Sequence, residues 1–261
     1  MSTAFRSKYG PWAVIAGASE GLGAAFALAL ASRGVNLLLL ARRGDVLDEV
    51  AVLLRTESKV EVRTEACDLA RPDLAGVLER ATRDLEVGVA VYNAAYAPVG
   101  DVLGRSMDDL LRVVDVNVRG PLVFARTLAP RMVARGRGGI VLMSSMAGFQ
   151  GAPRIATYAA TKAFNTVLGE GLWSELGPHG VDVVVSCAGA IRTPGYAKSA
   201  SGDAPGTLDA RAVAEQTLDT LGRGPVVVPG ATNRLARFVL GRVLTRRAAI
   251  AVMARSTKEL A

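Results

Sequence analysis

Short apolar runs alternate along the chain with longer stretches in which polar and apolar residues mix. The runs are nearly continuous in Val, Leu and Ile, as is typical of strands buried on both faces of a parallel sheet. Seven runs are predicted as strands: Trp12–Ala16, Val35–Ala41, Val60–Glu65, Val87–Asn93, Gly139–Ser144, Val181–Cys187 and Pro225–Val228. The intervening stretches predict helices over residues 22–33, 45–55, 72–84, 106–135, 157–177 and 209–222.

Strand alternating with helix is the pattern of right-handed βαβ units. We therefore predict a doubly wound α/β fold with a single seven-stranded parallel sheet and helices on both faces. No repeat or linker divides the chain, so residues 1–230 are expected to form one domain. Within it, the loop at about 190–208 follows the sixth strand, where ligand crevices open in such folds. This loop is either a flap over a site or a plain surface loop.

Composition narrows the class of protein. Half of the 261 residues are hydrophobic, which is enough for a large core and excludes disorder as the main state. The chain has one histidine, His179, and two cysteines, Cys67 and Cys187. Because a four-ligand Cys/His zinc site would need carboxylates as well, we predict no metal. The lack of a disulfide framework is typical of a reducing compartment, so we expect a cytoplasmic protein.

The net charge of +7 is concentrated in the last part of the chain. Residues 231–261 hold seven basic residues and one acidic residue, which leaves residues 1–230 close to neutral. A near-neutral body gives no reason to expect a nucleic-acid partner. Residues 231–261 are predicted as a basic amphipathic extension that packs against the body or a second subunit. Peripheral contact with an anionic membrane surface is the alternative for this extension.

A glycine-rich turn, Gly17-Ala18-Ser19-Glu20-Gly21-Leu22-Gly23, follows the first predicted strand and opens the first helix. Glycines permit a tight turn and a close approach of backbone to a pyrophosphate, and the helix N-terminus offers free N–H groups. The turn therefore predicts a dinucleotide site, with a ligand-free glycine turn as the alternative. The expected contacts are Gly17, Ser19, Glu20, Gly21, Leu22 and Gly23.

The second predicted strand is followed by Arg42 and Arg43. A site that prefers NAD usually has an acidic residue in this region to hold the ribose hydroxyls. Guanidinium groups instead suit a 2′-phosphate, so we predict NADP(H) rather than NAD. Glu20 would oppose a phosphate slightly, and the alternative is that both arginines are solvated surface charges.

Three further polar residues have a spacing that indicates chemistry. Tyr158 and Lys162 lie four residues apart on a predicted helix and therefore share one face. Ser145 lies at the end of a predicted strand, thirteen residues before Tyr158, and Asn117 lies in the preceding long helix. The alternatives are a packed helical tyrosine and a helix-capping serine.

Taken in order, these residues resemble the short-chain dehydrogenase/reductase family over about Pro11 to Val228. The motifs are Gly17-x-x-x-Gly21-x-Gly23, Asp68, Asn93-Ala94-Ala95, Asn117, Ser144-Ser145 and Tyr158-x-x-x-Lys162. The resemblance implies a seven-stranded Rossmann fold and hydride exchange with a nicotinamide. The chain departs from the family pattern at Ala16, Ala95 and Ala188, where Thr, Gly and Pro are usual. None of these changes removes a group that the chemistry uses.

The chemistry can be derived from the side chains. A free tyrosine has a pKa of about 10, and a nearby ammonium group lowers that pKa. We therefore expect Tyr158 to be the general acid/base and Lys162 to tune it. Ser145 would stabilise charge on the substrate oxygen. The resemblance adds that Lys162 holds the nicotinamide ribose and that Asn117 holds a water molecule in a proton relay.

The resemblance also assigns the remaining cofactor contacts. Asp68 would contact the adenine amino group, and Thr193 and Ile191 would hold the nicotinamide carboxamide. The set of predicted cofactor-binding residues is completed by Leu69, Asn93 and Ala94. Relatives pair through the two long helices, here 106–135 and 157–177, so a homodimer or homotetramer is expected.

The expected substrate pocket is apolar and has no charged anchor. Its expected lining is Ala97-Pro98-Val99, Met146, Phe149, Ala152 and the Tyr196 segment, with Arg154 and Arg192 close by in sequence. We predict an NADP(H)-dependent oxidoreductase that interconverts a hydrophobic ketone and a secondary alcohol, steroid-like or long acyl. The alternatives are a 3-oxoacyl thioester reductase and, from another class, a non-catalytic nucleotide-binding sensor or interaction protein.

Overall fold

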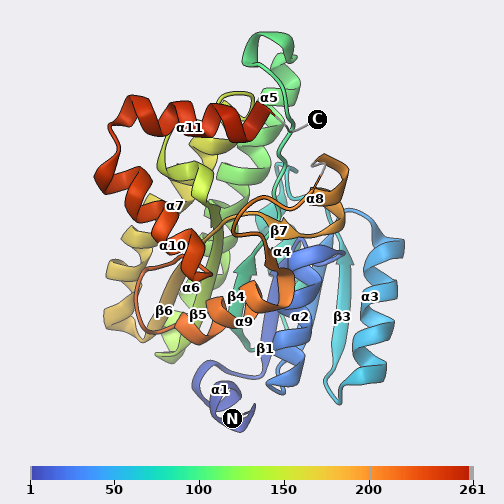
Figure 1. Ribbon diagram of the computed structural model, residues 1–261. Helices are drawn as coiled ribbons and strands as arrows, with labels where there is room; N and C mark the ends of the chain where they lie inside the picture. The colour runs from blue at the N-terminus through green and yellow to red at the C-terminus, as the bar shows by residue number, and fades with distance from the viewer. Residues whose placement is uncertain (1, 200–201, 259–261) are drawn as a thin grey trace.

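The computed structural model describes residues 2–199 and 202–258. Its main sheet has seven parallel strands in the order β3-β2-β1-β4-β5-β6-β9 (Figure 1). The strands are β1 (Trp12–Ala16), β2 (Asn36–Ala41), β3 (Val62–Ala66), β4 (Val87–Tyr92), β5 (Gly138–Ser145), β6 (Val181–Ala188) and β9 (Val226–Val227). The predicted doubly wound fold is confirmed. Strand β9 is shorter than expected and pairs only with β6.

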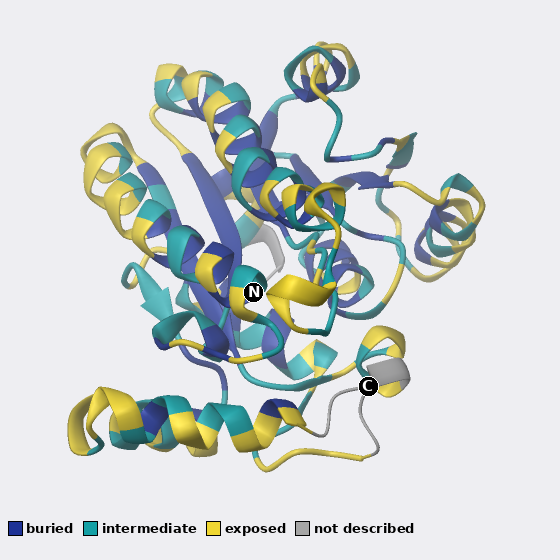
Figure 2. Cartoon of the chain, turned by 90° about the horizontal axis from the view of Figure 1, so that it is seen from above, coloured by how far each residue is buried: buried dark blue, intermediate teal, exposed yellow. Residues whose placement is uncertain are grey.

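Alternate residues of the strands face two separate cores. In β1, Ala13 and Ile15 pack under α2 (Gly21–Ser32), α3 (Gly44–Glu57) and α9 (Ala210–Thr220). Val14 and Ala16 pack under α4 (Leu74–Ala81), α6 (Gly120–Arg135) and α7 (Ala156–Leu176) on the other face. Figure 2 shows the buried sheet between helices whose outer faces are exposed. Successive side chains of a strand point to opposite faces of the sheet, and helices cover both faces. This arrangement explains why the strands are continuous apolar runs.

The strand order reverses between β1 and β4, and this placement opens the crevice that holds a ligand in such folds. The chain leaving β4 stays attached to β1, because the N–H groups of Asn93 and Ala94 both donate to the Ala16 carbonyl, at 3.0 and 2.9 Å. The glycine-rich turn that follows β1 therefore lies directly beside the loop that follows β4.

The long helix expected over 106–135 is interrupted. It consists of α5 (Met107–Val114), a π-helical turn (Asp115–Arg119) and α6. The Tyr92 hydroxyl donates to the Val116 carbonyl at 2.6 Å, and the N–H of Gly120 bonds to Asp115 instead. A Cβ atom at residue 120 would stand 2.0 Å from the Tyr92 hydroxyl, so the bulge and Gly120 make room for that side chain.

Two other regions differ from the sequence expectation. A helix, α1 (Ser2–Tyr9), precedes β1 and is tied to β6 by the Tyr9 hydroxyl, which donates to Asp182 at 2.9 Å. The loop at 190–208 contains α8 (Pro194–Ser199) and a small sheet of β7 (Ile191–Arg192) with β8 (Leu208–Asp209). Short 3-10 turns occupy Val102–Gly104, Met146–Phe149 and Gly177–His179.

The C-terminal extension folds onto the body. It forms α10 (Ala231–Phe238), a π-helical turn (Val239–Val243) and α11 (Arg246–Lys258), drawn in red at the upper end of the sheet in Figure 1. The carboxyl ends of the strands point to that end. Over residues 2–199 and 202–258, no helix combines the length and the apolar character that a membrane crossing requires.

Candidate active site

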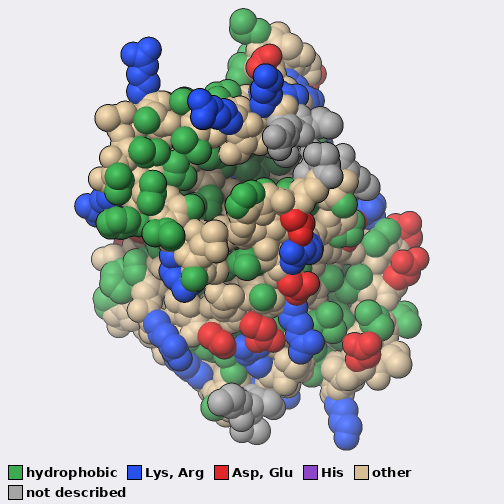
Figure 3. Space-filling view, viewed as in Figure 1, with side chains coloured by type: hydrophobic (Ala, Val, Ile, Leu, Met, Phe, Trp, Pro, Cys, Tyr) green, Lys and Arg blue, Asp and Glu red, His purple; other side chains and the backbone are tan. Residues whose placement is uncertain are grey.

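A cleft of about 1350 Å³ opens at the carboxyl ends of the strands. Figure 3 shows its mouth as a hollow below α11. Most of the predicted site residues line it: Gly17, Ser19, Glu20, Gly21, Leu22, Arg42, Arg43, Asp68, Leu69, Asn93, Ala94, Ser145, Tyr158, Lys162, Ile191 and Thr193. Two predicted residues, Gly23 and Asn117, do not reach the cleft surface and lie behind its wall.

The glycine-rich turn packs too tightly for side chains. Gly17 has a φ of +84°, and a Cβ there would lie 2.7 Å from the backbone of Ala94. A Cβ at Gly23 would lie 1.9 Å from the Gly17 carbonyl oxygen, which also accepts a hydrogen bond from the Asn93 amide at 2.9 Å. Helix α2 begins at Gly21, and its preceding residue Glu20 makes no side-chain cap. The first N–H groups of α2 are therefore available to an anion in the cleft.

The two arginines after β2 differ in their partners. Arg43 forms an ion pair with Glu20 at 3.0 Å, and both side chains are about half exposed. Arg42 has no ion pair or hydrogen bond with another side chain in the part of the chain that the structure describes. Glu20 thus neutralises Arg43, and Arg42 presents a free guanidinium group to the cleft.

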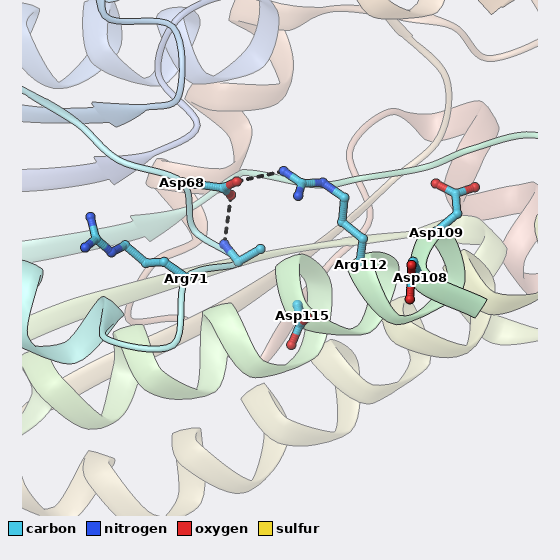
Figure 4. Close-up of a pocket in the computed structure, with 7 residues that line it drawn as sticks. Asp68, Arg71, Asp108, Asp109, Arg112 and Asp115 are labelled. Carbon is cyan, nitrogen blue, oxygen red and sulfur yellow. Dashed lines mark hydrogen bonds and ion pairs between the residues drawn. The ribbon is translucent and has the colours of Figure 1, made fainter. Parts of the chain in front are cut away.

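Asp68 is held in place by two donors (Figure 4). The Arg112 guanidinium of α5 lies 2.8 Å from Oδ2, and the Ala70 N–H donates to Oδ1 at 3.0 Å. Burial acts to raise the pKa of Asp68, but these two hydrogen bonds outweigh it and bring the pKa below its usual value. Asp68 therefore stays ionised at the nucleotide end of the cleft. Arg112 was not among the predicted site residues.

Ser145, Tyr158 and Lys162 meet at the other end of the cleft. Ser145 ends β5, and the other two lie one turn apart on α7. Lys162 is 2% exposed; its Nζ donates to the Met143 carbonyl at 2.9 Å and lies 5.5 Å from the centroid of the Tyr158 ring. Gly148 lets the turn after β5 rest on α7, because a Cβ there would lie 2.8 Å from the backbone of α7.

The ionisation of the tyrosine differs from the sequence expectation. Burial raises the pKa of Tyr158, and a hydrogen bond with Ser145 acts in the opposite direction without reversing the shift. Burial also lowers the pKa of Lys162 to about 8. The expectation of an unusually acidic phenol is therefore wrong for this state of the protein. At neutral pH the phenol keeps its proton, and the amine is still mainly charged.

The Asn117 side chain is fully used inside the protein. Its amide oxygen accepts from the Tyr96 N–H at 2.8 Å, and its amide nitrogen donates to the Tyr96 carbonyl at 2.9 Å and to Thr161 Oγ1 at 3.1 Å. These bonds tie the loop after β4 to α7. Pro121 has no N–H, so the Asn117 backbone carbonyl lacks the donor that a helix normally supplies four residues later.

The expected substrate pocket is only partly correct. Ala97, Val99, Met146 and Tyr196 line the cleft, whereas Pro98, Phe149 and Ala152 do not. Phe149 lies under the extension: the Arg237 guanidinium stacks 4.1 Å from its ring centroid, and Arg246 donates to its carbonyl at 2.6 Å.

The extension supplies residues that sequence reasoning missed. Those that line the cleft are Asn233, Ala236, Leu240, Met253, Arg255, Ser256 and Thr257. The expected lining had no charged anchor, and the extension adds one charged residue, Arg255, to the wall of the cleft. The apolar positions of the extension carried a weak signal. A straight helix does not separate them into faces, since the chain turns at Leu244 between two helices.

Comparison with known proteins places the chain in a family. The model of the short chain dehydrogenase family matches residues 11–204. The 7beta-hydroxysteroid dehydrogenase of Clostridium sardiniense is 32% identical over 234 residues, which is 88% of this chain and 89% of that protein. The very-long-chain 3-oxoacyl-CoA reductase of Podospora anserina is 38% identical over 182 residues, or 67% of this chain and 53% of that protein.

Solved structures of known proteins have a similar fold. One of them, from work on the stereoselectivity of 7beta-hydroxysteroid dehydrogenase, has a TM-score of 0.90 at 28% identity, covering 95% of this chain and 98% of that chain. A short-chain dehydrogenase from Sphingobium yanoikuyae in complex with NADPH has a TM-score of 0.79 at 32% identity, covering 92% and 95%. The protein thus belongs to the short-chain dehydrogenase/reductase family and is an oxidoreductase that acts on CH–OH and C=O groups.

Proposed function

We propose that this protein interconverts a hydrophobic ketone and a secondary alcohol with NADP(H). The observation that carries the proposal is the cleft itself. Its one end holds the glycine-rich turn and the free guanidinium of Arg42, and its other end holds Ser145, Tyr158 and Lys162. The similarity to hydroxysteroid dehydrogenases favours a steroid-like substrate, because the cleft is large and apolar side chains such as Val99, Met146 and Leu240 line it.

The donor set of the cleft fits a dinucleotide phosphate. The uncapped start of α2 would hold the pyrophosphate, Asp68 the adenine amino group and Arg42 the 2′-phosphate. Lys162 would hold the nicotinamide ribose, with Ile191 and Thr193 at the carboxamide. When bound, the nicotinamide supplies or accepts the hydride. We propose the remaining contacts at Ser19, Glu20, Leu22, Leu69, Asn93 and Ala94.

Tyr158 moves the proton in this proposal. In reduction, its hydroxyl gives a proton to the substrate oxygen, and the phenol that burial keeps protonated at neutral pH is suited to that direction. Ser145 donates a hydrogen bond to the same oxygen and stabilises its developing charge. The Lys162 ammonium, one turn away, favours the phenolate that is left. In oxidation the same groups act in reverse.

Tyr158 must regain its proton after each reduction, and we propose that the backbone of Asn117 takes part in the proton relay that returns it. Because its side-chain amide is occupied by Tyr96 and Thr161, we propose that the carbonyl freed by Pro121 holds the water molecule. The side chain then positions that carbonyl.

A 3-oxoacyl thioester reductase is the second candidate, supported by the similarity to very-long-chain 3-oxoacyl-CoA reductases. The same catalytic residues would serve it, since both substrates present a ketone next to an apolar chain. The two candidates are distinguished by the substrates that the protein accepts in the assay below. A nucleotide-binding sensor without turnover would need no Ser145–Tyr158–Lys162 set.

The cofactor is tested by nicotinamide absorbance with cyclic ketones and 3-oxoacyl thioesters. We expect turnover with NADPH and a higher KM with NADH. Arg42→Ala should raise the KM for NADPH roughly tenfold or more, because a charge-assisted hydrogen bond contributes about 1.5–3 kcal/mol, and should leave the KM for NADH unchanged. Arg43→Ala is the matched control with a smaller effect, since Glu20 already pairs with Arg43. A wild-type preference for NADH would contradict the prediction.

We propose that residues 1–230 form the catalytic domain and that residues 231–261 extend it. The exposed apolar side chains of α5 and α7, among them Met107, Leu111 and Val167, support a homodimer or homotetramer.

The extension exposes Leu235, Phe238 and Val243 among arginines, which supports contact with an anionic membrane surface by a cytoplasmic protein. Figure 3 shows apolar side chains gathered over this region.

Sedimentation with and without anionic vesicles tests both surfaces. Without vesicles we expect the mass of two or four chains. With vesicles we expect part of the protein to co-sediment, and Phe238→Glu to abolish that fraction because it places a negative charge on the apolar face. Leu103→Glu, at a fully exposed leucine far along the chain from the extension, is the control that should still co-sediment. Equal sedimentation of all three proteins would reject membrane contact, and a mass of one chain would reject the oligomer.

A further inference from the structure

The charged residues of the cleft fall into two groups. Most lie at the nucleotide end: Glu20, Arg42, Arg43, Asp68 and Arg112. At the substrate end, the described lining contains Lys162, Asp203 and Arg255. Lys162 belongs to the reacting centre, and Asp203 is paired with Arg192 at 2.7 Å. Arg255 is the remaining charge, and the reaction itself assigns it no role.

Arg255 has no acidic partner in the described part of the chain. No ion pair or hydrogen bond joins it to another residue there, and Arg255 is an exposed residue that lines the cleft. The extension's part of the wall carries the apolar side chains of Ala236, Leu240 and Met253 beside the uncharged polar residues Asn233, Ser256 and Thr257. A cation in a cleft wall that has no counter-charge among the described residues is suited to an anionic group on the ligand.

The helix that carries Arg255 is fastened at both ends to the segment before the catalytic tyrosine. Arg246 donates to the Phe149 carbonyl at 2.6 Å, and Arg154 donates to the carbonyls of Thr257 and Lys258 at 3.0 and 2.9 Å. Arg154 does so from a backbone φ of +64°, an uncommon conformation for a residue with a side chain.

Between those two ends, α11 also packs against Tyr158 and its neighbours. Met253 packs with Ile155 and Tyr158 against the small cluster of Ala147 and Ala159. Arg255 lies two residues beyond Met253, so the packing of Met253 fixes the helix backbone that carries Arg255 relative to Tyr158. A guanidinium on an anchored helix can position a substrate by its far end.

We propose that the substrate carries a carboxylate remote from its ketone, and that Arg255 binds this carboxylate. The inference rests on the proposed ketone reductase function and names its substrate class: an apolar keto acid rather than a neutral ketone. Arg255 acts as a specificity residue. It touches the anionic end of the substrate and takes no part in moving the proton or the hydride.

Matched pairs of substrate test the proposal. Cyclic ketones that bear a carboxylate on an alkyl arm are compared with their methyl esters, using NADPH. We expect the wild type to have a KM about tenfold lower for the acid than for the ester. Arg255→Met, which keeps an apolar stem, should raise the KM for the acid to that for the ester, with kcat unchanged. Arg255→Lys should keep part of the preference.

A control variant separates local binding from overall charge. Arg247 is exposed on the same helix and does not line the cleft, so Arg247→Met removes one charge without touching the site. It should retain the preference for the acid. Equal KM values for acid and ester in the wild type would overturn the proposal, as would an equal rise of both KM values in Arg255→Met.

Calorimetry distinguishes failure of this proposal from failure of the proposed function. The affinity for the acid and for the ester is measured without turnover, with NADP⁺ present, in the wild type and in Arg255→Met. Tighter binding of the acid that is lost in Arg255→Met supports the carboxylate site even if no ketone is reduced. Turnover of neutral ketones with no such difference in affinity overturns the carboxylate site and leaves the reductase function standing.

Discussion

Replacing Tyr158 by Phe is expected to lower kcat by about 10²- to 10⁴-fold, the usual contribution of a positioned acid/base. The substitution removes only the hydroxyl and keeps the ring that packs beside Ile155 and Met253, so the fold should be retained. The dissociation constant for NADPH should change little, because the phosphate-binding end of the cleft is untouched. Stopped turnover with retained nucleotide binding is the combination that distinguishes an enzyme from a nucleotide-binding sensor.

The measurement is the rate of NADPH oxidation beside a fluorescence titration with NADPH. Tyr196→Phe is the matched control: Tyr196 also lines the cleft, and its hydroxyl donates to the Gly202 carbonyl at 3.0 Å rather than facing Ser145. That variant should keep most of the activity. Unchanged kcat in Tyr158→Phe would rule out the proposed proton transfer.

Gly23→Ala is expected to weaken nucleotide binding strongly through backbone geometry alone. The added Cβ would stand 1.9 Å from the Gly17 carbonyl oxygen and 2.9 Å from the Asn93 amide nitrogen. A carbonyl cannot move aside as a flexible side chain can, so the turn must open. We expect a loss of affinity for NADPH of roughly 100-fold and a loss of unfolding free energy of about 1–3 kcal/mol, as for an overpacked core.

Gly171→Ala is the control for that substitution. Gly171 lies in α7, and nothing is within 4 Å of the position a Cβ would take. Because Ala favours a helix over Gly, this variant should be more stable by up to about 1 kcal/mol and should bind NADPH normally. Urea unfolding and a fluorescence titration measure the two quantities. Normal NADPH affinity in Gly23→Ala would show that the tight turn is not required for binding.

The sheet could be predicted from the sequence because its signal is local. A run such as Trp12–Ala16 is buried on both faces, and any parallel sheet with helices on both sides demands that composition. Helix α1 gave no such signal. It is short and mostly polar, and it is fixed by contacts with residues far along the chain, among them those of Lys8 and Tyr9 with Asp182.

The interruption between α5 and α6 depends on another element. The periodicity over 106–135 is that of one helix, and nothing in it shows that the Tyr92 hydroxyl will reach the Val116 carbonyl. The ionisation of Tyr158 is likewise a property of its surroundings. Spacing identified Lys162 as its neighbour, but burial sets the direction of the shift in the pKa of the phenol.

The arrangement of α11 has a consequence for how such proteins diversify. The family model ends at residue 204, whereas the wall of the cleft that carries Met253 and Arg255 comes from residues beyond it. The proposed reacting residues thus lie in the matched part of the chain, and one part of the cleft wall lies outside it. Substitutions after residue 204 can change this wall and leave the proposed catalytic residues unchanged. High sequence identity over residues 11–204 therefore does not show that two members of the family share a substrate.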